Sequence, residues 1–461
     1  MTCLKSSGLG SVSNKLLNTA LRVNSSRSAP KNSIELQIPL NVLVSPHDQK
    51  NVKKNDLHRI GNEIIKTFET DETFKGIALS PPESKNTLLN FQINSNTFFR
   101  KLLHDVWTCA DEDYVAEKLF ALPKEQIIVE FSSPNIAKPF HVGHLRSTML
   151  GNFVSNLLQS MGHNVKRINY LGDWGTQFGL LQFGIARKWY TMADIARDPI
   201  KILLEIYVRA NQMAEADETV AAEARNLFRR MESGDEDVLK DWSVIRQFTI
   251  DELIPTYGRL GVHFDEFHWE SNYGIESINS VLNALKKLGI LFEHDGKQVV
   301  ALDNDQRVTL VKSDGSSLYL TRDLAAAIDR RNRYRFQRMY YVVDGSQSNH
   351  FAALKNVLKL MGNSEWSDSL EHVKFGRIQG MSTRRGTAIH LTQLLDEAFN
   401  RMKTKQMQSP TTKVDVDTNP DVTDTLAVTS IIINDLKQRR QKDYVFNWDN
   451  ALQVSSNHNK Y

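Results

Sequence analysis

The sequence predicts an α/β protein built around a parallel sheet, on three observations. Gln126–Phe131 is a short apolar run rich in β-branched residues and is bounded by Ser132-Ser133-Pro134, as a buried strand would be. A helical pattern follows, and Val165–Asn169 has the composition of a second strand. Strand, helix and strand within about 45 residues form a βαβ unit, which implies parallel strands and a right-handed crossover.

Length and composition exclude several protein classes. The chain has 461 residues, about three typical domain lengths, so two to four domains are expected. Apolar residues make up 41% and charged residues 24%, which excludes a mostly disordered chain. A mean hydropathy of −0.40 and the lack of a long apolar run argue against a membrane-spanning helix, so no membrane partner is expected. The two cysteines, Cys3 and Cys109, are too few for a disulfide scaffold or a Cys-rich zinc module.

The first 34 residues have the composition of an organelle-targeting segment. They contain five Lys or Arg residues, eight Ser residues and no Asp or Glu, and they lack the apolar core of a secretory signal. Without these five charges the formal charge of +3 becomes −2, so the rest of the chain is not a generally basic surface. We expect residues 1–34 to be a transit segment for the mitochondrial matrix. A disordered basic N-terminus without a targeting role is the alternative.

Residues 35–115 are expected to form a small α/β domain. The alternation over Glu35–Ile38 predicts a strand, and the spacing over Asn55–Phe68 predicts a helix. Thr87–Phe99 is predicted to be extended.

The helix after the Gln126–Phe131 strand has the clearest pattern in the chain. Its apolar residues recur at spacings of three and four, and Gly162 provides a C-terminal stop. These apolar residues are Val142, Leu145, Met149, Phe153, Leu157 and Met161.

Later segments predict an insertion and then more of the α/β pattern. Arg187–Leu260 is predicted to be helical with charged faces. Gly296–Leu320 predicts short antiparallel strands around the turn Ser313–Gly315, and Met339–Val343 predicts a buried strand. Two helical segments are expected after it, one from about His350 to Met361 and one over Thr392–Asn447 with a polar gap at Ser409–Asp421.

The loop between the first buried strand and its helix is the expected ligand site, because open parallel sheets bind ligands beyond the ends of their strands. It contains Lys138, His141, Gly143 and His144. Free N–H groups and the dipole at a helix start favour anions, so this set suits a nucleoside triphosphate. Two surface histidines on a helix are common, and the whole string after a strand is therefore a stronger signal than the pair.

The string KPFHVGH at Lys138–His144 resembles the HIGH signature of class I aminoacyl-tRNA synthetases. The wider string SSPNIAKPFHVGHLRST, with YLGDWGTQFG at Tyr170–Gly179, is similar to arginyl-tRNA synthetases in particular. The resemblance extends from about Ser33 to Asp449. It implies a Rossmann-like parallel-sheet catalytic domain with a helical insertion, a small N-terminal α/β domain and the start of an α-helical C-terminal domain.

The resemblance assigns arginine binding to five residues. Tyr319 and Asp323, in LYLTRD, match the family motif YxTRD, whose tyrosine and aspartate hold the substrate side chain. Gln347 matches a family glutamine, and Glu130 and Asn135 flank the HIGH loop at positions that contact arginine in the family. A guanidinium favours carboxylates, which Glu130 and Asp323 would provide. A helix N-cap is the alternative role for Asp323, and the two roles are compatible.

The same resemblance assigns ATP binding to Lys138, His141, Gly143 and His144, with Lys138, His141 and His144 as the catalytic set. ATP is expected to carry Mg²⁺, and no dedicated metal site is expected in the protein.

The second ATP signature of class I enzymes, KMSKS, is replaced here by GMSTRRGT. Met381 and Arg384 are expected to contact ATP there, and Arg385 is a further candidate. The signature lysines are absent, and Lys138 stands where many family members are thought to compensate for them. A flexible surface turn is the alternative for this segment.

The resemblance also sets expected domain boundaries. Residues 35–115 would contact tRNA, residues 116–395 would form the catalytic domain with its insertion at about 187–300, and residues 396–461 would begin an anticodon-binding domain. The family pattern fades after Asp449, so we expect a C-terminally truncated chain that lacks about one small domain.

The expected function is arginine–tRNA ligation in the mitochondrion by a monomer. Arginine would react with ATP to give arginyl-adenylate, and the arginyl group would pass to the 2′-hydroxyl of the terminal adenosine of tRNA(Arg). A non-catalytic form that binds tRNA or another partner is the alternative, because of the departure at the C-terminus. A HIGH-bearing nucleotidyltransferase that does not use tRNA is disfavoured by GDWGTQFG and YxTRD.

A run of arginines is a weaker candidate for tRNA contact, because phosphate binding by such residues is common but so is helix-surface charge. The run consists of Arg330, Arg331, Arg333, Arg335 and Arg338.

Overall fold

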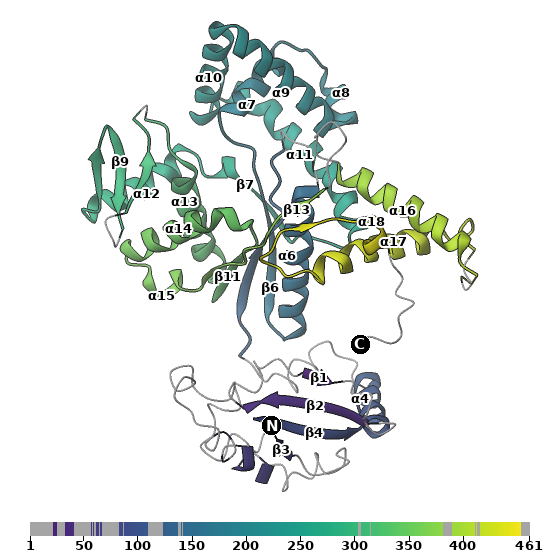
Figure 1. Cartoon of the computed structure of the whole chain (residues 1–461). Coiled ribbons are helices and arrows are strands. Elements are labelled where there is room, and N and C mark those ends of the chain that lie inside the picture. The colour runs from purple at the N-terminus through teal and green to yellow at the C-terminus, as the bar shows by residue number, and fades with distance from the viewer. Residues whose placement is uncertain are drawn as a thin grey trace. The chain divides into compact units, whose positions relative to one another are not determined.

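The chain divides into two compact units (Figure 1): Met1–Leu122 with Ser455–Tyr461, called the N-terminal unit, and Pro123–Val454, called the larger unit. The computed structural model describes residues 22–24, 33–40, 57, 59, 61–63, 65–66, 83–85, 87–108, 123–136, 140, 142–302, 306–313, 315–380, 390–410, 412 and 415–452.

The N-terminal unit contains an antiparallel sheet and a helix. The strands, in spatial order, are β1 (Arg22–Asn24), β2 (Ser33–Pro39), β4 (Leu88–Asn94) and β3 (Glu83–Lys85). Strand β1 lies within the range expected for the transit segment. The extended stretch expected to reach Phe99 ends at Asn94, because the Asn94 side chain accepts a hydrogen bond from the Thr97 amide and caps helix α4 (Ser95–Thr108).

The larger unit is built on the predicted parallel sheet. Its strands, in spatial order, are β12 (Leu370–His372), β11 (Arg338–Tyr341), β5 (Gln126–Glu130), β6 (Asn164–Leu171) and β7 (Glu266–Trp269). All neighbouring pairs are parallel. The chain runs outward from β5 to β6 and β7 and then returns to the other side of β5, so the topological switch point lies between β5 and β11.

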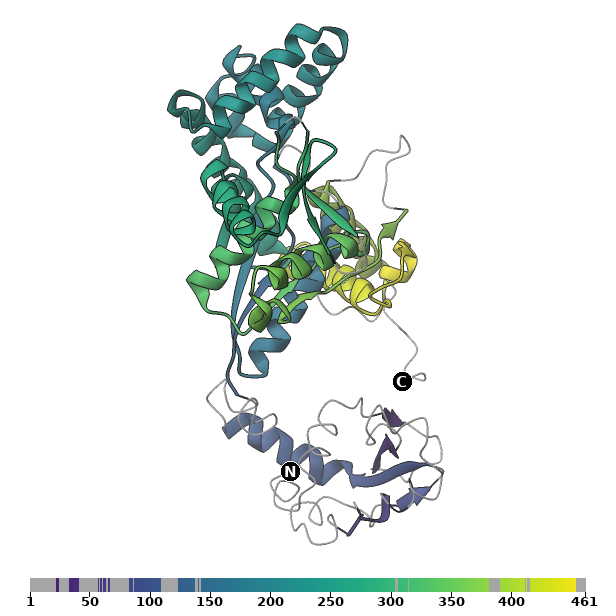
Figure 2. The ribbon, with the colours of Figure 1, turned by 90° about the vertical axis from the view of Figure 1, so that its left-hand side faces the viewer.

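Alternate residues of the central strand support two separate cores. Ile127 and Val129 face a core formed with helices α6 (Val142–Ser160), α16 (Leu391–Gln408) and α17 (Pro420–Leu436). Ile128 faces a second core with α12 (Ile275–Lys287), α13 (Tyr319–Tyr334) and α14 (Ser348–Leu360). This period of two is what a strand covered on both faces requires. Figures 1 and 2 show the two groups of helices on opposite sides of the sheet.

The predicted helical insertion is confirmed, and Gly179 explains how it packs. Its helices are α8 (Met192–Arg197), α9 (Pro199–Ala216), α10 (Glu218–Glu232) and α11 (Glu236–Arg259), next to α7 (Thr176–Ala186). A Cβ atom on Gly179 would lie 2.1 Å from the Ala224 carbonyl oxygen, so only glycine permits this approach of α7 to α10. The range expected for the insertion, about 187–300, also contains β7, a strand of the central sheet whose four residues are too few for a clear pattern.

A small antiparallel sheet precedes the next part of the α/β pattern. The predicted strands are β9 (Lys297–Ala301) and β10 (Arg307–Val311), joined by β8 (Leu291–His294). The turn at Gly315 (φ 82°) does not join these strands but leads from β10 into a helix, since Leu318 donates its amide to Leu310. The remaining elements around it are η4 (Glu270–Asn272), α12 (Ile275–Lys287), α13 (Tyr319–Tyr334), η6 (Gly345–Gln347), α14 (Ser348–Leu360) and α15 (Ser364–Ser367).

The C-terminal segment packs within the larger unit. Helices α16 and α17 flank the predicted polar gap, and Pro420 opens α17 at a position where its missing N–H costs no hydrogen bond. Strand β13 (Ile378–Gln379) pairs in parallel with β14 (Tyr444–Val445), and α18 (Trp448–Ala451) follows. No helix of the described part of the chain is long and apolar enough to span a membrane.

Candidate active site

A cavity of about 410 Å³ lies beyond the carboxyl ends of four adjacent strands of the central sheet. All five residues predicted to bind arginine line it: Glu130, Asn135, Tyr319, Asp323 and Gln347. The other lining residues are Ser133, Tyr170, Gly172, Glu270, Arg330, Tyr341, Val343, His350 and Phe351. The cavity is therefore built from segments that are far apart in the sequence.

The register of the central strands brings several side chains together at the base of the cavity. Glu130 is the last residue of β5 and pairs in register with Tyr341, the last residue of β11, at the switch point. Tyr170 lies near the end of β6, and Glu270 follows the last residue of β7 directly. Ends of parallel strands meet at one edge of a sheet, so these side chains converge there.

Helix α13 contributes three more cavity residues. It begins at Tyr319, so Tyr319 and Asp323 lie one turn apart on the same face, as predicted. The residue at the N-cap is Leu318, which excludes the capping role considered for Asp323. Arg330 lies further along the same helix.

The loop that leaves β5 has an unusual backbone. Ser132 and Ser133 have φ angles of 70° and 46°, a left-handed region that non-glycine residues rarely adopt. Two hydrogen bonds hold it: the Ser132 amide donates to Ser147 Oγ at 3.0 Å, and the Ser133 amide donates to Asn169 Oδ1 at 3.0 Å. These contacts place Asn135 beside Gly172, with which it forms an isolated parallel bridge.

Glu130 has an internal counter-ion that the sequence did not indicate. Arg330 Nη1 lies 2.5 Å from Glu130 Oε2, and both side chains are almost fully buried. The Arg330 guanidinium also lies over the Tyr170 ring, 4.6 Å from its centroid. Burial raises the pKa of Glu130, and Arg330 partly offsets that rise.

The arginine run considered for tRNA contact is divided between the cavity and the surface: Arg330 is buried, whereas Arg333, Arg335 and Arg338 are exposed, and tRNA contact by these three stays a prediction. Arg330 is buried in the cavity, Arg331 donates to the Phe336 carbonyl, Arg333 pairs with Asp329 and Glu266, and Arg338 pairs with Glu125. Four of the five residues thus have partners within the larger unit.

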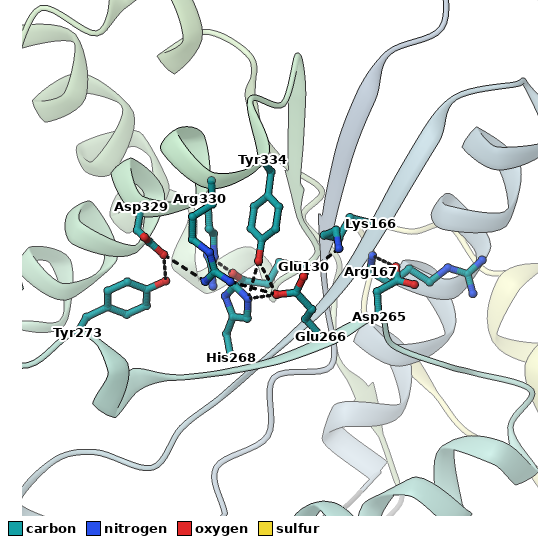
Figure 3. A network of polar contacts seen from close by, with 11 residues as sticks. Glu130, Lys166, Arg167, Asp265, Glu266, His268, Tyr273, Asp329, Arg330 and Tyr334 are labelled. Carbon is teal, nitrogen blue, oxygen red and sulfur yellow. Dashed lines mark hydrogen bonds and ion pairs between the residues drawn. The ribbon is translucent and has the colours of Figure 1, made fainter.

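A polar network fixes α13 against β7 (Figure 3). The Tyr334 hydroxyl donates to Glu266, and Lys166 Nζ lies 2.8 Å from the same carboxylate. One turn of α13 closer to the cavity, Asp329 accepts a hydrogen bond from the Tyr273 hydroxyl at 3.0 Å. These contacts orient the helix that carries Tyr319, Asp323 and Arg330.

Asp323 is paired with a histidine that the sequence reasoning did not assign to the site. His350 Nε2, on α14, lies 2.7 Å from Asp323 Oδ2. Burial lowers the pKa of His350, but the hydrogen bond to Asp323 and its charge raise it by more. The aspartate therefore favours the charged imidazolium.

Glu270 is a third carboxyl group in the cavity. Burial raises its pKa to about 8, and the nearby charge of Asp323 contributes to the rise, while Arg322 opposes it. A strongly perturbed acid in a cleft is typical of ligand-binding sites.

Gln347 lies on a turn fixed by its neighbours. The Asp344 side chain accepts a hydrogen bond from the Ser346 amide at 2.8 Å and so caps η6. Arg377 Nε lies 3.0 Å from Asp344 Oδ2, and Arg377 Nη2 lies 3.3 Å from Ser346 Oγ. Burial raises the pKa of Asp344, but the hydrogen bonds from Arg377 and Ser346 lower it by more.

The predicted ATP loop is described in part. His144 lies in the first turn of α6, with its ring stacked on Phe140 at a centroid distance of 5.6 Å, and Gly143 beside it is exposed. Lys138, His141, Met381 and Arg384 lie outside the described residues.

Arg146, also on α6, joins this helix to the C-terminal segment. Its side chain is 1% exposed, and Nε lies 3.3 Å from Asp435. Nη1 donates to the carbonyl oxygens of Gly376 at 2.5 Å and Lys442 at 2.9 Å, and Nη2 donates to that of Arg439 at 3.3 Å. The segment around residues 435–442 therefore supports the helix that begins at the predicted ATP loop.

The ionisable cavity residues that sequence reasoning did not assign to the site are Tyr170, Glu270, Arg330, Tyr341 and His350. Position at the end of a strand was a usable signal for Tyr170 and Tyr341. Glu270 offered the same signal only if β7 had been recognised. Pairing of Arg330 with Glu130 and of His350 with Asp323 joins distant parts of the chain, and no local pattern encodes it.

Comparison with known proteins gives the chain a family context. Residues 114–448 match the family model for tRNA synthetases class I (R), catalytic domain. The chain is 42% identical over 371 residues to the probable mitochondrial arginine–tRNA ligase of Bos taurus, covering 79% of this chain and 64% of the bovine protein. It is 37% identical over 425 residues to that of Mus musculus, covering 91% and 72%. The chain thus spans somewhat less than two thirds of the length of the bovine relative.

The fold has a counterpart among solved structures. Arginyl-tRNA synthetase from Plasmodium falciparum superposes with a TM-score of 0.71 at 23% identity, covering 99% of this chain and 78% of the other. The class I fold expected from the sequence is thereby confirmed.

Proposed function

Because the chain belongs to the class I arginyl-tRNA synthetase family, we propose that it activates arginine with ATP and transfers it to tRNA(Arg). The observation that carries the proposal is the cavity: three carboxyl groups, Glu130, Glu270 and Asp323, converge on a space of about 410 Å³. A guanidinium is planar and permanently charged, so carboxylates around a cavity of this size suit it.

In this proposal Asp323, Glu270 and Tyr319 receive the guanidinium, and Asn135 and Gln347 contact the rest of the substrate. Glu130 has its own cation, Arg330, and contributes a fixed carboxylate at the switch point. The substrate carboxylate then attacks the α-phosphate of ATP, pyrophosphate leaves, and arginyl-adenylate forms. The arginyl group passes to the 2′-hydroxyl of the terminal adenosine.

The phosphates are assigned to the start of α6, where Gly143 and His144 lie and where Lys138 and His141 are expected. A helix N-terminus stabilises the negative charge that develops during phosphoryl chemistry. Met381 and Arg384 remain the proposed contacts of the second loop. Mg²⁺ is proposed to arrive with the ATP phosphates, because Mg²⁺ is usually bound through substrate phosphates and one or two carboxylates rather than by a dedicated protein cage.

The proposal includes the cellular location and the assembly state of the protein. The mitochondrial relatives and the basic, acid-free first 34 residues support a role in mitochondrial translation, in the matrix. We propose that the protein works as a monomer and without a membrane.

The test is ATP-dependent charging of tRNA with labelled amino acids by the full chain. Arginine is expected to be charged and lysine not, and His144→Ala is expected to lower adenylate formation while the protein stays folded. A folded chain that binds tRNA but charges no amino acid would contradict the proposal and favour the non-catalytic binding form.

A further inference from the structure

Three acidic side chains and two basic side chains line the cavity. Two of the three acids have a cation at ion-pair distance: Glu130 has Arg330 at 2.5 Å, and Asp323 has His350 at 2.7 Å. Within the described part of the chain, Glu270 has no cation at such a distance. One carboxyl group of the cavity is therefore left over when its neighbours have been paired.

The surroundings of Glu270 do not favour its charge. The acids Asp323, Glu130 and Asp173 act on it from α13, β5 and the segment after β6. Arg322 is the cation acting on it, but its Nε donates to the Tyr273 carbonyl at 3.2 Å.

The remaining groups that face the cavity are the cations Arg330 and His350, each already paired, and three phenols, Tyr170, Tyr319 and Tyr341. Phenols are neutral near pH 7, so they supply no counter-charge. Partial burial and like charges raise the pKa of Glu270 to about 8, which is consistent with this arrangement.

We propose that the cavity takes up the guanidinium of its substrate in exchange for one proton, which leaves the Glu270 carboxyl group. The O–H bond of the neutral acid breaks, the proton passes to solvent, and the carboxylate that remains pairs with the guanidinium. The Glu130–Arg330 and Asp323–His350 pairs keep their charges. The inference rests on the proposed function and adds a specificity role for Glu270: a neutral ureido analogue of arginine brings no charge to replace the proton.

The experiment is calorimetric titration of the full chain with arginine in two buffers of different ionisation enthalpy, which gives the number of protons released. From the pKa of about 8, about 0.9 proton per arginine is expected at pH 7 and about 0.5 at pH 8. Over the same interval the dissociation constant for arginine should fall about fivefold, because a smaller fraction of Glu270 is protonated and must lose its proton on binding. Citrulline, the ureido analogue, should release no proton.

Variants identify the source of the proton. Glu270→Gln should bind arginine more weakly and release almost no proton at pH 7, whereas Glu270→Asp should retain release. His350→Gln is the matched control, because it removes the imidazole of the cavity, which could also release a proton, and should leave release in place.

Three results would overturn the inference: arginine binding at pH 7 without proton release, release that persists in Glu270→Gln, or release that disappears in His350→Gln. Each of these leaves the proposed function standing, since arginine still binds. No binding of arginine at all would overturn both. Should Glu270→Gln bind too weakly to titrate, the pH dependence of the wild type still decides.

Discussion

Replacing Arg330 with methionine removes the counter-ion of Glu130 but keeps a side chain that is long and unbranched. The two charged side chains are 1% and 6% exposed and lie 2.5 Å apart, so the variant leaves a buried carboxyl group without a partner. Breaking such a pair costs about 3–5 kcal/mol of folding free energy. The double variant Glu130→Gln with Arg330→Met removes both charges, and it should cost only about 1–2 kcal/mol, mainly from the lost contact of the guanidinium with Tyr170.

Thermal unfolding followed by tryptophan fluorescence measures this difference. Six of the seven tryptophans lie in the larger unit, so the signal reports mainly on that unit. At about 2 °C per kcal/mol, the single variant should lower the Tm by about 6–10 °C and the double variant by about 2–4 °C.

The pH dependence of stability distinguishes an effect of the unpaired Glu130 charge from a simple loss of packing. Burial already raises the pKa of Glu130 above 4.5, and removing Arg330 raises it further. The folded variant then binds this proton more strongly than the unfolded chain does, so the stability deficit of Arg330→Met should grow as the pH increases from 5.5 to 8. The double variant should show no such growth. A single variant within about 1 kcal/mol of the wild type, or a double variant equally destabilised, would refute the reasoning.

Three further outcomes are expected elsewhere in the larger unit. Arg146→Met should lower the free energy of unfolding by about 3–5 kcal/mol, because Asp435 loses its buried counter-ion. It should also increase hydrogen exchange in β13 and β14, because the carbonyl oxygens of Gly376 and Lys442 lose their donor; unchanged exchange would contradict this. Arg377→Ala, at an exposed position, should raise the KM for arginine about two- to fivefold with kcat retained, because Asp344 loses its partner at the turn that carries Gln347. The effect should shrink in high salt, whereas a salt-independent effect would argue against an ion pair. Gly179→Ala should cost about 1–3 kcal/mol through the clash of α7 with α10, measured by urea unfolding, and a neutral result would show that the helices can separate.

Much of the fold could be predicted because its local patterns are strong. The apolar run at Gln126–Phe131 and the spacing over Val142–Met161 give a strand and a helix with few alternatives, and the structure places both as expected. Strand β7 could not be predicted, because its four residues follow a long helical segment and pair only with a strand about one hundred residues earlier. The end of β4 depended on a single cap, Asn94, which changes an extended segment into a helix.

The candidate site was predictable where a motif carries it. The motif residues Asn135, Tyr319 and Gln347 line one cavity of the structure. The electrostatics of the cavity were not predictable, because the Arg330 side chain looks like surface charge until α13 is packed against β5. A residue's charge state depends on neighbours that only tertiary structure supplies, and pairs such as Asp323 with His350 are therefore properties of the fold.

The most direct test of the central claim is the KM for arginine in tRNA charging by the full chain and by its Asp323→Ala variant. The variant removes a carboxylate proposed to hold the guanidinium, so the KM for arginine should rise about tenfold or more, which corresponds to at least about 1.4 kcal/mol, while the KM for ATP stays within about twofold. An unchanged KM for arginine in a folded and active variant would contradict the assignment of this cavity to arginine.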